Sequence, residues 1–146
     1  MTLGPASLLL ILPALACPAA FSGARAQTQI APPQPRVIEI LADHDSRFKI
    51  AGEKEPIITV RAGELVTLRI TAIKARNRNR DGSIHGFTLL HAGDETPVPG
   101  WDFLLKPGLQ EFTLPAPSQP GEYVVVCTVI CSPRHEGMHM KFAVLP

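Results

Sequence analysis

Residues 121–138, GEYVVVCTVICSPRHEGM, are the most informative part of the sequence. They join a strand-like segment to a cluster of metal-ligating side chains. Its first part, Gly121–Val126, is rich in β-branched residues and opens on a Pro-Gly turn signal, as is typical of a strand. Its second part packs two thiols, an imidazole and a thioether into one loop, at Cys127, Cys131, His135 and Met138. The loop therefore begins at the end of a strand, with its first cysteine.

On either side of this segment, the apolar residues come in short runs separated by Gly, Pro, Asp and Asn. In residues 65–71, for example, Val66, Leu68 and Ile70 share one face of an extended chain, and polar residues occupy the other. No stretch shows a sustained helical period. We expect strands at Val37–Leu41, Arg47–Ile50, Ile57–Val60, Leu65–Ile73, His85–His91, Trp101–Leu105, Leu109–Leu114, Tyr123–Cys127 and His139–Leu145.

These strands are short, and turn signals separate them, including one at residues 97–100 (PVPG). Many short strands at this spacing predict an all-β protein, an antiparallel sandwich or barrel. The chain has 146 residues, which is enough for one domain.

The composition excludes several classes of protein. The chain is 45% hydrophobic, so it is not wholly disordered, and its formal charge of +1 argues against a nucleic-acid binder held by phosphate contacts. It shows no nucleophile with a general base, no phosphate-binding loop and no paired carboxylates, which makes hydrolytic catalysis a poor interpretation.

The N-terminus is typical of an export signal. An uncharged apolar stretch is followed by the A-x-A pattern Ala24-Arg25-Ala26, so we expect a signal peptide over residues 1–26. Two alternatives are an uncleaved membrane anchor and a lipoprotein cut before Cys17. Each of the three places the folded part outside the cytoplasm, most simply in a bacterial periplasm.

Cleavage after Ala26 would change the charge and cysteine counts. It removes one of the 14 basic residues and none of the 13 acidic ones, which leaves a net charge of zero. It also removes Cys17, so that Cys127 and Cys131 are the two that remain. We expect residues 27–36 to be a proline-rich leader and residues 37–146 to be the domain.

The loop chemistry favours copper. Thiolate and thioether ligands select Cu(I), imidazole accepts either oxidation state, and Cys and His with a weak Met are typical of copper electron-transfer sites. One loop rarely encloses a metal alone, so a further ligand should come from elsewhere. His85, at the expected start of a strand after a polar turn, is the best candidate.

Residues 37–146 resemble the cupredoxins. The pattern C-x-x-x-C-x-x-x-H-x-x-M, with the upstream Ile84-His85-x-Phe87, is similar to the dinuclear copper A branch found in cytochrome oxidase subunit II and nitrous oxide reductase. The resemblance implies a Greek-key β-sandwich and one-electron transfer through a mixed-valence pair of copper ions.

The resemblance also implies a ligand set. Cys127 and Cys131 would bridge the two coppers, and His85 and His135 would be the terminal imidazoles. Met138 would be the weak ligand on one copper and the backbone carbonyl of Val129 the weak ligand on the other.

The chain departs from the subunit II pattern in three ways. That pattern usually has an acidic residue where Val129 stands and glycine where Ser132 stands. The transmembrane hairpin typical of subunit II is missing, so we expect no integral membrane hairpin.

Other interpretations of the same residues remain open. Two cysteines four apart form disulfides in oxidising compartments. Structural zinc could use both cysteines, His135 and one more ligand, but would leave Met138 without a role. A mononuclear blue copper site, with Cys131 or Cys127 and His135, would leave one thiol unused.

The remaining candidates near this chemistry have simpler roles. We expect His44 to be a turn residue, His91 to be a surface or hydrogen-bonded histidine, and Phe87 and Trp101 to lie in the core or against the site. Met140 is the alternative to Met138 as the thioether ligand.

A basic run, Lys74, Arg76, Arg78 and Arg80, stands out in a chain of near-zero net charge. It is either a solvated loop or a docking patch for an acidic redox partner, because a local charge steers encounter.

The leading functional hypothesis is a periplasmic electron carrier rather than an enzyme, with copper as cofactor, a redox protein as partner and no nucleic acid. A second hypothesis is a copper carrier or chaperone, and an exposed, labile site would favour it. A third is a small copper oxidase, such as the ferroxidase component of periplasmic metal uptake, with Glu136 as the only obvious carboxylate in the loop.

Overall fold

A computed structural model describes Met1, residues 34–73 and residues 75–146 of the chain. The expected signal peptide, the leader up to residue 33 and Lys74 lie outside the described residues. The described part contains nine strands and one short 3-10 turn, η1 (His135–Gly137). The strands are β1 (Arg36–Ala42), β2 (Phe48–Lys49), β3 (Ile57–Arg61), β4 (Leu65–Ala72), β5 (His85–His91), β6 (Pro97–Leu105), β7 (Gly108–Pro115), β8 (Gly121–Val126) and β9 (His139–Leu145).

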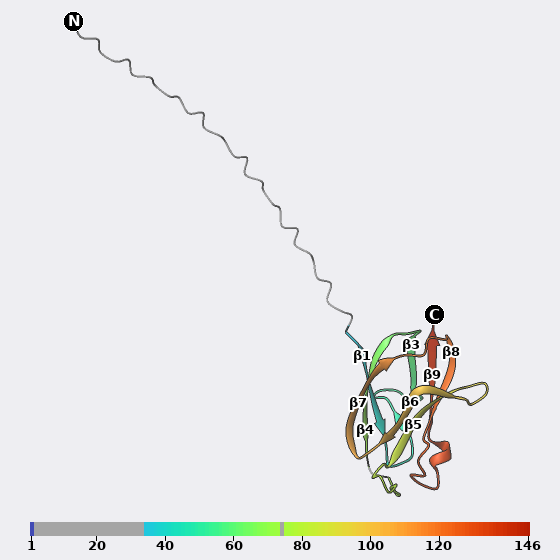
Figure 1. Ribbon diagram of the computed structural model, residues 1–146. Helices are drawn as coiled ribbons and strands as arrows, with labels where there is room; N and C mark the ends of the chain where they lie inside the picture. The colour runs from blue at the N-terminus through green and yellow to red at the C-terminus, as the bar shows by residue number, and fades with distance from the viewer. Residues whose placement is uncertain (2–33, 74) are drawn as a thin grey trace. The chain divides into compact units, whose positions relative to one another are not determined.

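The strands form two sheets that pack face to face (Figure 1). One sheet has the order β2-β1-β4-β7 and the other has the order β3-β9-β8-β5-β6. The predicted all-β sandwich is therefore confirmed. It is not purely antiparallel, because β1 runs parallel to β4 and β3 runs parallel to β9. Alternation of apolar residues predicts which face of a strand is buried, but it carries no information on strand direction.

The greatest difference from the expected strands is at β6. It begins at Pro97 rather than Trp101, so residues 97–100 belong to a strand and the expected turn there is wrong. β6 lies at the edge of its sheet, where a proline without an N–H does not interrupt the ladder. A register shift opposite, between Thr88 and Leu90, and a positive φ at Gly100 accommodate the irregular strand.

β4 shows how the alternating pattern builds the sandwich. Val66, Leu68 and Ile70 are fully buried between the sheets, as their spacing predicts. On the outer face, Arg69 is hydrogen-bonded to Glu39 of β1 and to Glu111 of β7, each at 2.6 Å. One face of β4 therefore supplies core, and the other links the neighbouring strands through ion pairs.

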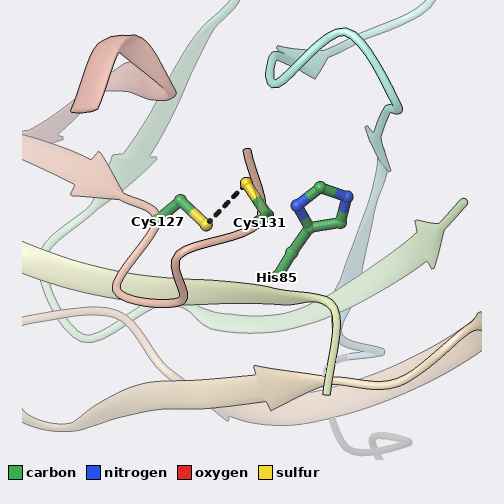
Figure 2. A group of neighbouring side chains, drawn as sticks. All are labelled: His85, Cys127 and Cys131. Carbon is green, nitrogen blue, oxygen red and sulfur yellow. Dashed lines mark hydrogen bonds between the residues drawn. The ribbon is translucent and has the colours of Figure 1, made fainter. Parts of the chain in front are cut away.

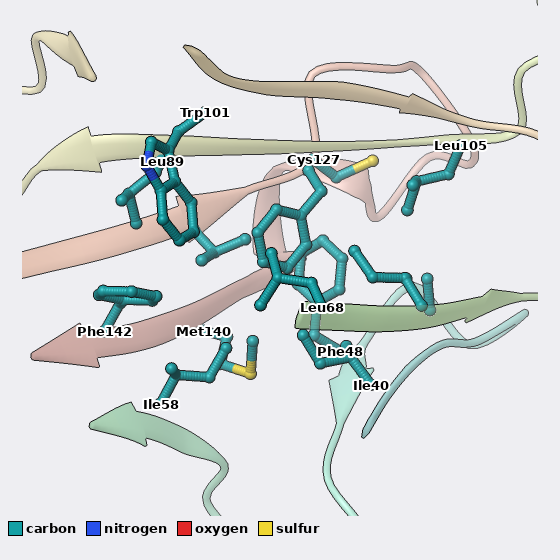
Figure 3. Packing of buried hydrophobic residues seen from close by; sticks show 14 of the residues in the cluster. Ile40, Phe48, Ile58, Leu68, Leu89, Trp101, Leu105, Cys127, Met140 and Phe142 are labelled. Atoms are coloured by element: carbon teal, nitrogen blue, oxygen red, sulfur yellow. The ribbon is translucent and has the colours of Figure 1, made fainter. Parts of the chain in front are cut away.

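Aromatic side chains fill the space between the sheets (Figure 3). The Trp101 ring meets the Phe142 ring edge to face at 5.3 Å, and the Phe87 ring meets Phe48 in the same way at 5.5 Å. Phe87 and Trp101 are thus core residues, one of the two roles expected for them. Cys127 borders this core, so the loop that begins there starts from a rigid base.

Four segments meet at one end of the sandwich. β8 ends at Val126 and the antiparallel β5 begins at His85, so the start of β5 lies beside the loop 127–138. The parallel strands β1 and β4 also end side by side, at Ala42 and Ala72, and lead into the turns that follow them. Figure 1 shows η1 and these turns at the same end of the domain. Within the described residues, no helix is long and apolar enough to cross a membrane.

Candidate metal centre

His85, Cys127 and Cys131 form a buried cluster at this end of the sandwich (Figure 2). Their ligand atoms all lie within 4.8 Å of one another. The two Sγ atoms are 3.8 Å apart, and both cysteines are free thiols rather than a disulfide. The start of β5 and the loop after β8 therefore bring together an imidazole and two thiols. Gly86, the residue after His85, contacts Cys127 Sγ although the two residues are 41 positions apart in the chain.

The thioether and a backbone carbonyl lie against the same thiols. Met138 Sδ is 4.0 Å from Cys131 Sγ, and its side chain is buried. The Val129 carbonyl oxygen accepts a hydrogen bond from Cys127 Sγ at 3.3 Å. Met140, the alternative thioether, is a buried residue of β9 paired with Val125 of β8. The structure thus places Met138 and Val129 beside the cysteines.

His85 supplies the clearest sign that the cluster is built for a ligand. The residue is 1% exposed, and its Nδ1 has no hydrogen-bond partner in the described part of the chain. Its Nε2 lies 3.4 Å from the carbonyl oxygen of Ile73. Burial lowers the pKa of His85, which favours the neutral imidazole that metals bind. A buried nitrogen without a partner costs free energy, and a metal ion would supply the missing partner.

The donor types fit copper. Two sulfur atoms, an imidazole and a thioether are the set that soft or borderline metals select. Burial raises the pKa of the Cys127 thiol to about 11, so a metal that binds there must displace the proton. The residues of this cluster therefore fit a copper site.

His135 stands apart from this cluster. It lies in η1, half-buried, and its Nδ1 is 3.0 Å from the carbonyl oxygen of Ser132. The group of atoms within mutual ligand distance contains His85 and the two cysteines, without His135. Its role as the second imidazole stays a prediction.

His44 lies in the expected turn, and His91 is a half-buried residue of β5. His44 lies in the turn after β1, with its Nδ1 2.5 Å from Asp43 Oδ1 and most of its side chain exposed. His91, at the far end of β5, packs against the ring of Tyr123 at 4.8 Å.

Gly86 is a functional residue that the sequence pattern alone did not single out. Its N–H donates a hydrogen bond to Cys127 Sγ at 3.3 Å. A Cβ added at this position would lie 2.3 Å from Thr128 Oγ1 and 2.8 Å from the Thr128 nitrogen. Only glycine therefore lets β5 approach the loop closely enough to make this contact. The signal in the sequence was a glycine directly after the predicted ligand His85.

Ser46 is a second residue that sequence reasoning missed. Its hydroxyl is 3.9 Å from Cys131 Sγ and 2.6 Å from the hydroxyl of Ser132, which accepts a hydrogen bond from the Arg134 N–H at 3.0 Å. Ser46 has a φ of 60°, a conformation unusual for a residue other than glycine. Ser132, one of the departures from the subunit II pattern, thus ties the loop to the turn between β1 and β2.

The sequence matches no protein-family model, and no curated protein matches it. Solved structures do share its fold. Auracyanin A, a blue copper protein from the green thermophilic photosynthetic bacterium Chloroflexus aurantiacus, is 24% identical, with a TM-score of 0.55 over 77% of this chain and 100% of that one. Auracyanin B is 22% identical, with a TM-score of 0.52 over 79% of this chain and 93% of that one. Reduced rusticyanin is 19% identical, with a TM-score of 0.51 over 77% of this chain and 81% of that one. The two-sheet sandwich is therefore the cupredoxin fold.

Proposed function

We propose that this chain is a copper-binding electron-transfer protein that works outside the cytoplasm, most simply in the periplasm. The observation that carries the proposal is the buried group of His85, Cys127 and Cys131, in which His85 Nδ1 lacks a partner among the described residues. The cupredoxin fold supports it, since auracyanin A is described as a blue copper protein. The expected export signal, residues 1–26, supports the location.

In the proposal, copper is held by the side chains of His85, Cys127, Cys131 and Met138 and by the carbonyl oxygen of Val129. We assign the second imidazole to His135, on the same loop. When bound, copper supplies a centre that gains or loses a single electron without a proton.

We favour two copper ions over one because two thiols face each other in the cluster. The Sγ atoms are 3.8 Å apart and each has a further sulfur or oxygen contact, from Met138 on one side and Val129 on the other. A mononuclear site leaves one of these thiols without a role. This pairing of contacts supports the copper A-like arrangement that the loop motif implies.

The surroundings of the cluster suit electron transfer more than copper delivery. Cys131 and His85 are at most 1% exposed, and Cys127 is 7% exposed. A carrier that hands copper to a partner needs accessible ligands. An electron, by contrast, can reach a buried copper site through the surrounding protein. The ligands are also held by the core, by the hydrogen bond that the Gly86 N–H donates to Cys127 Sγ and by the contact of the Ser46 hydroxyl with Cys131 Sγ, which limits rearrangement between oxidation states.

Copper stoichiometry tests the proposal. The reduced protein, titrated with copper and measured by native mass spectrometry, should bind two ions. Cys131→Ser should lose at least one of them, because it removes one of the two facing thiols. The matched control is Ser132→Ala, which changes the next residue without removing a thiol. Failure of the fully reduced protein to bind copper would overturn the proposal.

A further inference from the structure

A segment rich in arginine is held against the metal loop by backbone hydrogen bonds. The N–H groups of Arg76 and Asn77 both donate to the carbonyl oxygen of Cys131, each at 3.1 Å. The Asn77 side-chain amide also donates to the carbonyl oxygen of Ile130, at 3.3 Å. The position of this segment is therefore coupled directly to a predicted copper ligand.

The positive charges on this segment have no partners among the described residues of the domain. Arg76, Arg78 and Arg80 are exposed, as is Arg134 on the metal loop. Within the described residues, none of their guanidinium groups forms an ion pair or hydrogen bond. Three basic side chains elsewhere are paired: Arg36 with Glu64, Lys49 with Asp43 and Asp45, and Arg69 with Glu39 and Glu111.

Two of these arginines line a surface hollow beside the metal loop. It has a volume of about 570 Å³, and its lining includes Asp45, Arg76 and Arg134. Arg76 and Arg134 come from two different segments. Asp45 is the one acidic residue of this lining, and its carboxylate is already paired with Lys49 at 2.8 Å. The two arginines of the hollow therefore have no carboxylate partner among the described residues.

An apolar side chain projects beside these charges. Ile130 is 64% exposed, although it is the residue directly before the buried Cys131. An exposed apolar group next to charged residues is the usual composition of an interface, with an apolar contact and a polar rim. We name Arg76, Arg78, Arg134 and Ile130 the arginine face.

We propose that the arginine face docks an acidic redox protein over the metal loop. Partner carboxylates meet the arginines, and an apolar side chain of the partner packs on Ile130. One electron then passes between partner and copper site, so that one is oxidised as the other is reduced and no bond is made or broken. This inference rests on the proposed function and adds the chemistry of its partner.

An acidic protein fits this face better than an anionic membrane. Asp45 lines the same hollow as Arg76 and Arg134, and Glu136 follows Arg134 by two residues. A uniformly anionic surface would meet these carboxylates as well as the arginines. A protein can place its carboxylates selectively against the arginines and its apolar residues against Ile130. Electrostatic complementarity of this kind raises the rate of association and is weakened by salt.

The first experiment measures binding on the copper-free protein, so it does not depend on the proposed function. A hexaglutamate peptide is titrated into the labelled protein while amide shifts are followed by NMR. We expect shifts centred on residues 76–80 and 130–134, and their loss when salt is raised. A hexalysine peptide should leave these residues unshifted.

Matched variants test the face itself. Arg76→Ser, Arg78→Ser and Arg134→Ser are combined in one protein, and Lys54→Ser, Arg61→Ser and Lys141→Ser in a control that also loses three exposed positive charges. Hexaglutamate affinity should fall about tenfold or more in the first variant and less than about threefold in the control.

The second experiment uses the copper-loaded protein. The rate of electron exchange with the anion hexacyanoferrate should fall about tenfold between low and high salt, and this dependence should flatten in the arginine variant alone. Equal losses in both variants, or shifts spread over the whole surface, would overturn the proposal. Tighter binding to phosphatidylglycerol vesicles than to hexaglutamate, again lost in the arginine variant, would replace the acidic protein by a membrane surface.

Discussion

A single ring nitrogen, His85 Nδ1, separates this site from an ordinary buried histidine. In a core, both nitrogens of a histidine normally find partners, because an unsatisfied polar atom costs about 1–3 kcal/mol. Here one nitrogen is unpaired among the described residues and lies in a group with two free thiols. The site therefore carries a local cost that ligand binding would recover, as is typical of functional positions.

The carboxylate of Asp43 accepts hydrogen bonds from His44 and Lys49 in the turn that holds Ser46. The hydrogen bond from Lys49 and the N–H of His44, which donates at 2.6 Å, lower its pKa from 3.8 to about 2. Because the carboxyl binds a proton more weakly in the folded state, it stabilises the fold above about pH 4, and this contribution is lost as the pH falls to about 2.

Asp43→Asn should therefore weaken the dependence of the free energy of unfolding on pH between about pH 4 and pH 2. The free energy of unfolding, measured by urea denaturation across this range, should fall less steeply in the variant than in the parent protein. Asp45→Asn is the control, since it removes the neighbouring carboxylate and keeps the contacts of Asp43. Identical slopes for the parent and Asp43→Asn would show that Asp43 does not set this dependence.

At the scale of elements, the site depends on how closely β5 approaches the loop after β8. The two strands are antiparallel neighbours, and Thr88 lies opposite Val126 at the last paired position before the loop. Beyond it, the Gly86 N–H donates to Cys127 Sγ, and a Cβ added at Gly86 would meet the backbone of Thr128. Gly86, which is not one of the predicted copper-coordinating residues, thus sets the spacing between His85 and the thiols.

Gly86→Ala should displace the loop. The added methyl group meets a backbone nitrogen at 2.8 Å, so the strand or the loop must move. We expect a loss of about 1–3 kcal/mol in the free energy of unfolding, together with weaker copper binding. Gly93→Ala, where a Cβ meets nothing within 4 Å, should change stability by less than about 0.5 kcal/mol. Equal effects at the two positions would contradict this account of the junction.

For the whole molecule, the sequence predicts the strands and the buried faces well, since both follow from local alternation. β5 and β9 begin and end where their residues predict. His85 could be paired with the loop in advance because its neighbours resemble those of a known motif. The sequence does not predict strand direction, the path of β6 or the role of Ser46, because each depends on contacts between residues far apart in the chain. Ser46, for example, reaches its partner Ser132 across 86 residues.

We propose that two thiols and an imidazole at the end of this sandwich would hold two copper ions. The most direct measurement is the electron paramagnetic resonance spectrum of the copper-loaded protein. We expect a seven-line copper hyperfine pattern, with two coppers per chain. A four-line pattern with one copper per chain would contradict it and would make this a mononuclear copper protein.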